Sequence, residues 1–163
     1  MSDVFSLPPD ARAKLHLWRA AKARVVFTNG VFDLLHRGHV EYLEEARALG
    51  DRLVVGVNSD LSTRRLKGPS RPIVAEGDRV ALVSALACVD LAVLFDDDTP
   101  LRMVEAVRPD VLVKGGDYEV ADIVGREAVE ARGGRVTTIA LREGISTSEI
   151  VRRIREGKGV GSE

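Results

Sequence analysis

The sequence of 163 residues lacks glutamine and has only one cysteine and two asparagines. The single cysteine, Cys88, has apolar neighbours and is expected in the core; it excludes a disulfide framework and a cysteine-based zinc site. No apolar run reaches the roughly 18–20 residues of a membrane span, and the first residues lack the apolar core of a signal peptide. Basic and acidic residues nearly balance, at 24 and 25, which argues against a general nucleic-acid-binding surface. We therefore expect a cytoplasmic protein that binds neither nucleic acid nor membranes.

The length and the apolar share of 45% are typical of a single folded domain. We expect this domain to span residues 24–155. Residues 1–23 are expected to form an N-terminal helical extension, in which Asp10 caps a helix that packs on the domain. His16 in this helix is expected to be a solvated or packed residue. The glycine-rich residues 156–163 are expected to form a flexible tail.

From residue 24 onward, short apolar runs rich in β-branched residues alternate with helical segments. The expected strands are Arg24–Thr28, Leu53–Val57, Leu91–Phe95, Val111–Lys114 and Arg135–Leu141. Helices are expected near 39–49, 76–89, 99–107, 122–132 and 147–155. This order predicts an α/β fold, a Rossmann-like open five-stranded parallel sheet with helices on both faces. Ligands of such sheets bind beyond the carboxyl ends of the strands, which here are followed by 28–39, 56–71, 95–99, 114–119 and 141–148.

The segment 28–39 joins the first strand to the first helix of the domain and contains the motif His-Arg-Gly-His. His36 and His39 are three residues apart at a helix entrance, where free N–H groups already favour an anion. We expect both imidazoles to stabilise a phosphate whose charge builds up in a transition state. Gly38 has no Cβ and is expected to let that phosphate approach the backbone. A metal site that includes Asp33 and a pair of surface histidines are the alternatives.

The end of the second strand is followed by Asn58 and then by a basic run at 64–72. Because glycine and proline interrupt this run, we expect a loop that can close over phosphates, although a solvated charged loop is the common alternative. Lys67 in this loop supplies a flexible point charge for a transferred phosphoryl group. At the end of the first strand, Gly30 is expected to form a tight turn.

Two more segments follow predicted strands at the same edge. In Val113–Tyr118 the two glycines are expected to admit a ligand next to the backbone, and Asp117 to accept hydrogen bonds from sugar hydroxyls; a plain turn is the alternative. In the Ser-Thr-Ser segment, Ser146 or Thr147 is expected to cap the last helix. The same N–H and hydroxyl groups would also hold phosphates.

The residues Thr28–Asp33 with His36–His39 resemble the nucleotidyltransferase superfamily that carries the HxGH signature, in particular its cytidylyltransferase-like branch. With the segments 65–72, 112–118 and the Ser-Thr-Ser helix start, the sequence resembles the adenylyltransferases that form ADP-heptose, over about 24–155. This resemblance implies transfer of AMP from ATP to heptose 1-phosphate by in-line attack on the α-phosphate, with release of pyrophosphate.

The resemblance also implies a role for each candidate residue. It implies contacts of both histidines with the nucleotide phosphates and places Arg79 near the transferred phosphate or the acceptor. It implies Mg²⁺ bound mainly through the nucleotide phosphates, with no metal site in the protein, and we expect a homodimer. The residues expected in catalysis are His36, His39, Lys67 and Arg79; for the nucleotide Thr28, Asn29, Gly30, Phe32, Gly38, Lys114, Gly115, Gly116, Asp117, Ser146, Thr147 and Ser148; and for the acceptor Asp33, Asn58 and Arg71.

Three other functions stay open on the sequence alone. The segment Glu143–Thr147 also resembles bacterial glycerol-3-phosphate cytidylyltransferases, which transfer CMP. A nucleotide-binding module without catalysis would keep the same fold. A piece of an RNA-charging enzyme would share the HxGH motif, although the chain lacks a basic face for RNA.

The scarce polar residues fall at the predicted site. Between Arg24 and Val151 the only histidines, asparagines and lysines all follow the first, second or fourth strand. They are His36, His39, Asn29, Asn58, Lys67 and Lys114. Residue types that the composition otherwise avoids therefore mark the places where we expect the chemistry.

Overall fold

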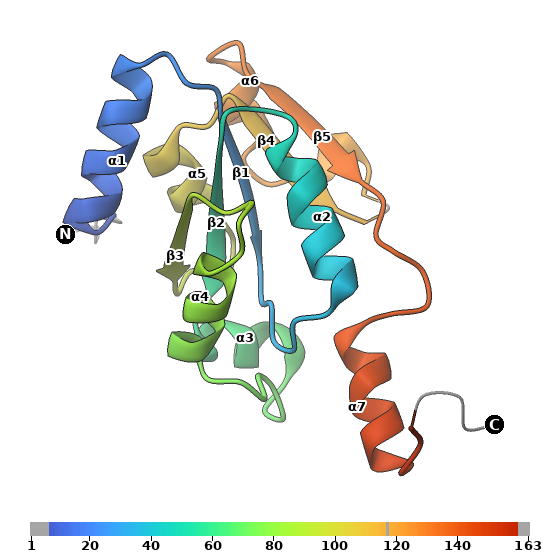
Figure 1. The fold of residues 1–163 in the computed structure, drawn as a ribbon. Coiled ribbons are helices and arrows are strands. Elements are labelled where there is room, and N and C mark those ends of the chain that lie inside the picture. The colour runs from blue at the N-terminus through green and yellow to red at the C-terminus, as the bar shows by residue number, and fades with distance from the viewer. Residues whose placement is uncertain (1–6, 117, 160–163) are drawn as a thin grey trace.

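The computed structural model describes residues 7–116 and 118–159 and is built on one sheet of five parallel strands (Figure 1). The strand order is β3-β2-β1-β4-β5, which confirms the predicted α/β architecture. Strand ends differ from the predicted ones by two residues at most. The strands are β1 (Val25–Gly30), β2 (Arg52–Asn58), β3 (Leu91–Phe95), β4 (Val111–Gly115) and β5 (Arg135–Ile139).

Helices cover both faces of this sheet, as expected. On one face, α1 (Pro9–Ala20), α5 (Leu101–Val107) and α6 (Arg126–Glu130) share an apolar cluster with the strands. On the other face, α2 (Arg37–Arg47) and α4 (Glu76–Ser84) do the same. Three more elements lie at the carboxyl edge: α3 (Asp60–Lys67), the short 3₁₀ helix η1 (Val120–Asp122) and α7 (Thr147–Arg155).

The N-terminal helix packs on the domain, as predicted. Ala11 and Leu15 of α1 are buried in the apolar cluster beneath the sheet, and Trp18 packs against it. The cap is not Asp10, however, because Pro8 precedes the first turn and Pro9 opens it. A proline fits the first helical position because its missing N–H would be unpaired there.

Three helical predictions were wrong. The helix expected near 76–89 ends at Ser84. The basic run does not begin as a loop, because residues 64–67 form the end of α3. Ser59 caps this helix by accepting a hydrogen bond from the Ser62 N–H at 3.0 Å. The helix was not predicted because it is short and has no regular apolar stripe. The helix expected at 122–132 is reduced to α6, since Gly125 has a φ of 93° and interrupts it.

Outside these elements, His16 is exposed and Cys88 is half-buried against the apolar cluster of α2 and α4. Residues 160–163 of the expected tail lie outside the described residues. In the described part of the chain, no helix is both long and apolar enough to cross a membrane.

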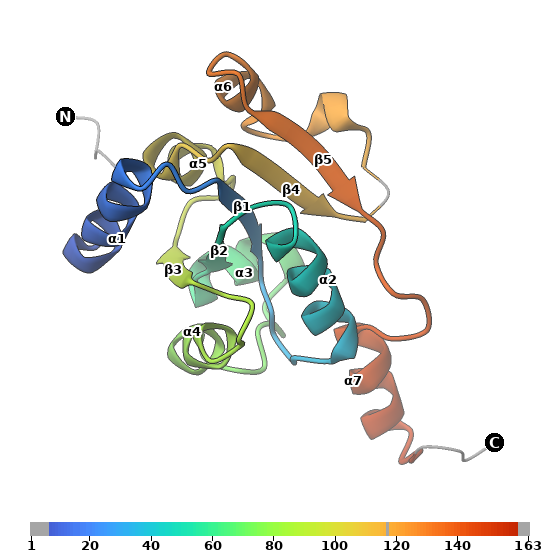
Figure 2. The same ribbon diagram turned by 45° about the horizontal axis from the view of Figure 1, so that its top comes forward.

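The order of the strands fixes where a ligand can enter. From β1 the chain builds outward to β2 and β3, and then returns to the other side of β1 with β4 and β5 (Figure 2). The carboxyl ends of β1 and β4 therefore flank the point at which the winding reverses, where open α/β sheets bind ligands.

Candidate active site

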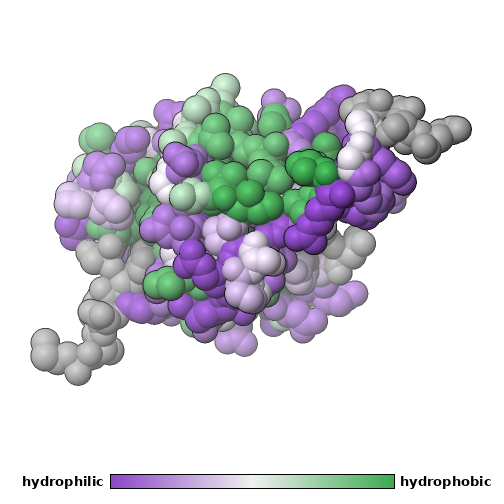
Figure 3. All heavy atoms as spheres, turned by 90° about the horizontal axis from the view of Figure 1, so that it is seen from below, coloured by the Kyte–Doolittle hydropathy of each residue, from purple (hydrophilic) through white to green (hydrophobic). Residues whose placement is uncertain are grey.

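A cavity of about 690 Å³ opens at this reversal point. Seen from the carboxyl edge, apolar residues gather near the centre of the surface and hydrophilic residues surround them (Figure 3). Eleven of the predicted site residues line the cavity: Asn29, Gly30, Phe32, Asp33, Asn58, Lys67, Arg71, Lys114, Ser146, Thr147 and Ser148. Segments from five parts of the chain thus meet as the sequence predicted.

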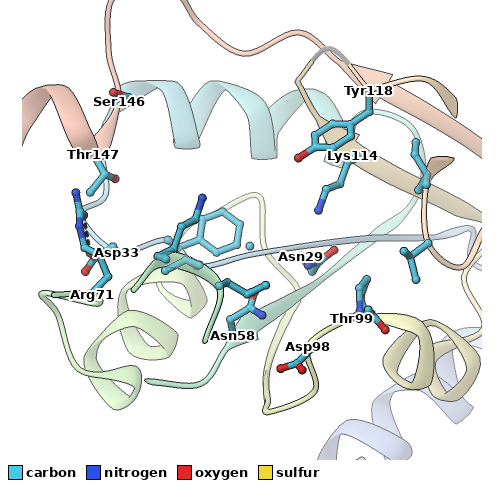
Figure 4. A pocket seen from close by; sticks show the side chains of 18 of the residues that line it. Asn29, Asp33, Asn58, Arg71, Asp98, Thr99, Lys114, Tyr118, Ser146 and Thr147 are labelled. Carbon is cyan, nitrogen blue, oxygen red and sulfur yellow. Dashed lines mark hydrogen bonds and ion pairs between the residues drawn. The ribbon is translucent and has the colours of Figure 1, made fainter. Parts of the chain in front are cut away.

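Two lysines give the cavity its positive charge. Lys67 at the end of α3 and Lys114 on β4 both line it, and neither forms an ion pair with a described residue. Burial lowers the pKa of Lys114, and the nearby charge of Lys67 lowers it further. The Lys114 Nζ lies 5.6 Å from the ring centroid of Tyr118 and points into the open space beside Asn29 (Figure 4). Two unpaired cations that repel one another across a cavity suit an anionic ligand.

The two histidines stack on one another behind the wall of the cavity. Their ring centroids are 3.8 Å apart with an interplanar angle of 23°. The Phe32 ring, which lines the cavity, lies 5.4 Å from the His39 ring. Both rings are half-buried, so they are not a surface pair. Neither histidine lines the cavity itself, and both lie at the start of α2 beside it.

Burial sets the protonation of this pair. Desolvation, with a smaller contribution from the neighbouring His36, lowers the pKa of His39 to about 4. Desolvation also lowers the pKa of His36. The Nδ1 atoms of both rings are buried and have no hydrogen-bond partner among the described residues. Buried ring nitrogens without partners are rare in folded proteins and indicate that a ligand or solvent completes the site.

The predicted metal alternative has no support in the described residues, which contain no cluster of three potential metal ligands. The carboxylate of Asp33 is instead fully used within the protein. Its Oδ2 accepts from Arg71 Nη1 at 2.8 Å, and its Oδ1 accepts from the N–H groups of Ile73 and Val74 at 2.8 and 2.9 Å. Burial alone would raise the pKa of Asp33, but these hydrogen bonds outweigh it and lower the pKa.

Asp33 therefore holds Arg71 and the residues after it at the cavity wall. Its side chain is only 4% exposed, whereas Arg71 is 18% exposed and faces the cavity. The structure thus gives Asp33 the place of a positioning residue and leaves the guanidinium of Arg71 as the group that a ligand can reach.

The start of α7 closes the cavity on another side. Ser146 is the N-cap, as predicted, and its Oγ accepts from the Glu149 N–H at 3.1 Å. Thr147 Oγ1 donates to the carbonyl oxygen of Leu34 at 3.4 Å, which ties this helix to the segment before α2. The free N–H groups of the first turn of α7 therefore lie at the cavity wall.

Arg79 and Thr28 do not reach the cavity. The Arg79 side chain is 0% exposed and donates to the carbonyl oxygens of Val74 and Val31 and to the carboxylate of Asp60, at 2.6 to 2.9 Å. Thr28 is buried and shares a hydrogen bond with the Tyr42 hydroxyl. The structure does not bring the guanidinium of Arg79 to the place that the resemblance implied.

At Gly30, Gly38 and Gly115, the space that a Cβ would fill is taken by neighbouring side chains of the protein. A Cβ on Gly30 would lie 3.0 Å from the Phe32 ring, and the left-handed residue of this turn is Phe32 itself, with a φ of 51°. A Cβ on Gly38 would lie 3.1 Å from the His36 ring, and one on Gly115 would lie 2.9 Å from Leu141. The predicted turn at Gly30 is therefore wrong, and Gly38 and Gly115 fit the packing of neighbouring side chains. Gly116 has a φ of 109°, and Asp117 lies outside the described residues.

Sequence reasoning missed part of the wall, which includes Val31, Leu66, Asp98, Thr99, Pro100, Leu112, Tyr118, Asp122, Ile123 and Val124. Most of these residues are apolar or lie in turns, so no chemistry marked them. The segment 95–99, expected at this edge because it follows a strand, already contains Asp98 and Thr99, but no role was predicted for either residue.

Known proteins resemble this chain along most of its length. Residues 27–153 match the family model described as cytidylyltransferase-like. The bifunctional protein HldE of Citrifermentans bemidjiense is 60% identical over 80% of this chain and 27% of its own length. That of Geotalea uraniireducens is 57% identical over 96% of this chain and 34% of its own length. The chain thus spans about a third or less of these curated relatives.

A solved structure resembles the fold and the sequence together. The lipopolysaccharide core biosynthesis protein from Thermoplasma volcanium GSS1 has a TM-score of 0.61 and 36% identity, over 74% of this chain and 97% of that chain.

Proposed function

Because the chain belongs to the cytidylyltransferase-like family, we propose that it is a nucleotidyltransferase that transfers AMP from ATP to heptose 1-phosphate. The products are ADP-heptose and pyrophosphate. The high identity to proteins named HldE supports this choice over CMP transfer to a polyol phosphate. The name of the structural neighbour supports a place in the synthesis of cell-surface sugars.

One observation carries the proposal. Two lysines without a described ion pair and the start of α7 line the cavity at the reversal of the sheet, and the stacked histidine pair at the start of α2 lies beside it, behind Phe32. Each of these groups favours phosphate, and together they offer more positive potential than one phosphate needs. A nucleoside triphosphate and a second phosphate substrate fit that excess of positive charge.

The reaction needs positioning more than acid–base chemistry. A phosphate oxygen of the acceptor attacks the α-phosphorus of ATP, and the bond from that phosphorus to the bridging oxygen breaks. The attacking oxygen is already an anion at neutral pH, so no general base has to remove a proton. The electron pair of the broken bond leaves on pyrophosphate. Catalysis then depends on in-line alignment and on stabilising the charge of the transition state.

We assign that stabilisation to His36, His39 and the N-terminus of α2. With a pKa of about 4, His39 is neutral at pH 7 in the free protein. A phosphate beside the ring would raise this pKa, because an anion favours the charged imidazolium. Each ring can then donate a hydrogen bond to the α-phosphate and the departing oxygen, as a preorganised donor in a site shielded from water.

The other groups divide the remaining phosphates. Lys67 and Lys114 are suited to the transferred phosphate and the acceptor, and Arg71, held by Asp33, presents its guanidinium beside them. The first turn of α7, with Ser146, Thr147 and Ser148, is suited to the leaving pyrophosphate. Arg79 acts through Asp60 and the backbone of the 74–79 segment, as a positioning residue.

Mg²⁺ would enter with the nucleotide and would neutralise part of the charge on its phosphates. Carboxylates at the cavity wall are few: Asp33 is bound to Arg71, and Asp98 pairs with Arg65. Asp122 is the remaining carboxylate among the described wall residues. This donor set fits an ion held mainly by phosphate oxygens and water, the common arrangement for Mg²⁺ in nucleotide sites.

A substrate matrix tests the proposal. Pyrophosphate release is measured with each of the four nucleoside triphosphates against heptose 1-phosphate, glycerol 3-phosphate and ethanolamine phosphate. We expect release with ATP and heptose 1-phosphate. Adenylyl transfer to glycerol phosphate, or cytidylyl transfer to any acceptor, would overturn the assignment, and release with no pair would indicate a binding module.

We further propose a cytoplasmic homodimer. The exposed Leu82 of α4 and Leu94 of the edge strand β3, on elements that pack together, support a self-association surface. Sedimentation equilibrium of wild type and of Leu82→Glu tests it: we expect a dimer for the first and a monomer for the second. A monomeric wild type would contradict the proposal.

A further inference from the structure

A second hollow, of about 710 Å³, lies at the amino edge of the sheet, opposite the candidate active site. It is formed where three connections approach the starts of β1, β4 and β5. The Val25 carbonyl accepts from the Asp110 N–H, and the Asp110 carbonyl accepts from the Arg135 N–H, both at 2.8 Å. These bonds fasten the three connections side by side at the top of Figure 1.

Six cations converge on this hollow. They are Arg19, Lys22, Arg24, Arg108, Arg132 and Arg135, and they come from α1, from the starts of β1 and β5 and from the ends of α5 and α6. The one carboxylate in the lining is Asp110, whose Oδ2 already accepts from the Val25 N–H at 2.8 Å. In a chain with a net charge of −1, this is a strong local excess of positive charge.

The pairing of the arginines sets this hollow apart from the rest of the molecule. Eleven of the nineteen arginines form ion pairs with described carboxylates: Arg37, Arg47, Arg52, Arg65, Arg71, Arg79, Arg102, Arg126, Arg142, Arg152 and Arg153. Of the other eight, five line this one hollow. Guanidiniums without a described carboxylate partner are therefore concentrated at one place, and among them Arg19 also donates to the Val107 carbonyl oxygen at 2.6 Å.

Helix dipoles explain only part of this concentration. A cation near the C-terminus of α1, α5 or α6 is favourable, which accounts for one residue at each helix. Arg24 precedes β1 and Arg135 begins β5, so neither lies at a helix end whose dipole would favour a cation. The groups also repel one another: burial lowers the pKa of Arg19 most, and Arg108 and Arg132 lower it further, while Asp110 raises it in part. Holding like charges together costs stability unless a ligand compensates for it.

We propose that this amino-edge hollow is a binding site for the polyphosphate group of a small anion, either inorganic pyrophosphate or the phosphate chain of a nucleotide. Planar guanidiniums that meet from several directions match phosphate oxygens in pairs. The hollow shape and a volume close to that of the candidate active site favour a small ligand over a flat macromolecular surface. The site is separate from the candidate active site and does not depend on the function proposed for it.

Calorimetric titration at low salt tests the proposal. Pyrophosphate and, separately, ATP are titrated into the wild-type protein, into Arg132→Glu/Arg135→Glu and into the control Arg12→Glu/Lys14→Glu. The control changes charge by the same amount on the exposed side of α1, away from the hollow. We expect the first variant to lose one binding site per chain, with affinity there at least about tenfold weaker, and the control to keep it.

A milder variant keeps the test decisive if charge reversal impairs folding. Arg132→Gln/Arg135→Gln removes the charges without adding new ones, and we expect it to weaken the same site about threefold to tenfold. Equal binding in wild type and both hollow variants would overturn the proposal. So would a loss confined to ATP, because recognition would then lie in the nucleoside, or a preference for a single-stranded RNA oligomer over pyrophosphate.

Discussion

The two edges of the sheet carry hollows of similar volume, about 690 and 710 Å³, but they organise charge in different ways. At the carboxyl edge the guanidiniums have partners: Arg71 pairs with Asp33, and Arg65 pairs with Asp98. The groups that a ligand can reach there are the two cavity lysines and the partly exposed Arg71, and the two histidines lie behind Phe32. At the amino edge the guanidiniums form no ion pair with a carboxylate of the described residues.

This difference distinguishes charges that hold the backbone in position from charges that attract a ligand. Paired charges fix the geometry of the backbone around them, as Asp33 does for Arg71, Ile73 and Val74. A reaction in which atoms must align within a fraction of an ångström needs backbone and side chains that are held in place in this way. Arginines without a described carboxylate partner remain available to pair with the oxygens of an anion. The fixed walls of the carboxyl edge fit the reaction proposed there, and the arginines of the amino edge fit the anion binding proposed for that edge.

The largest effect should come from a paired cation that contacts no ligand. Replacing Arg79 with alanine leaves Asp60 and two buried carbonyl oxygens without their donor. We expect the free energy of unfolding to fall by about 3–5 kcal/mol, measured by urea denaturation. The control Arg64→Ala, at an exposed arginine without a described ion pair, should change it by less than about 0.5 kcal/mol. If Arg79→Ala instead lost much of its kcat while its stability stayed unchanged, we would conclude that Arg79 contacts the transferred phosphate.

Removing a histidine should affect the reaction and leave the fold largely intact. For His39→Ala we expect kcat to fall by about 10²–10³, the scale of one lost transition-state donor, measured as pyrophosphate release under saturating substrates. His16→Ala, at the exposed histidine of α1, is the matched control and should keep wild-type kcat. A His39→Ala enzyme with near wild-type kcat would show that the carboxyl edge does not work as proposed.

Much of the candidate site could be predicted from the sequence, because the scarce residue types lie where the predicted order of strands places a ligand. The six scarce residues between Arg24 and Val151 lie at the carboxyl ends of strands or in the segments after them, and four of them line the cavity: Asn29, Asn58, Lys67 and Lys114. Parallel strands bring such ends to one edge whatever the details of the helices. The fold was therefore predictable from the alternation of strands and helices, even though α3 and the break at Gly125 were not.

What the sequence could not show is which charges are neutralised. Arg71 and Arg79 lie in the same stretch of sequence, but only Arg71 lines the cavity, because Asp60 and two carbonyl oxygens hold Arg79 inside. Pairing partners 19 and 38 residues away decide this outcome. The amino-edge hollow was missed for the same reason, since its cations come from distant connections.

A smaller effect is expected from the cavity lysines. Replacing Lys67 or Lys114 with alanine removes one unpaired cation, and a charge-assisted hydrogen bond is worth about 1.5–3 kcal/mol. We therefore expect kcat/KM for ATP to fall by about 10- to 100-fold, measured from initial rates. Lys14→Ala, on the exposed side of α1, is the control. An unchanged kcat/KM in both cavity variants would mean that the phosphates bind elsewhere.

The smallest effect concerns pH and distinguishes the two edges without any ligand. His39 has a pKa of about 4 in the folded protein, against about 6.5 in an unfolded chain. Between these values the unfolded state binds more protons, so stability is complete above pH 6.5 and falls as the pH drops toward 4. Because the ring is partly exposed, we expect a loss of roughly 1–3 kcal/mol, measured by urea denaturation at pH 7.5 and 4.5.

The variant His39→Ala should reduce this pH dependence, whereas His16→Ala should keep it. Arg132→Gln/Arg135→Gln, which changes only the amino edge, should keep it as well. If His39→Ala retained the full slope, the half-buried ring at the carboxyl edge could not be the neutral group that a phosphate is proposed to protonate. The acid sensitivity of the free protein thus tests the same desolvated imidazole on which the proposed catalysis depends.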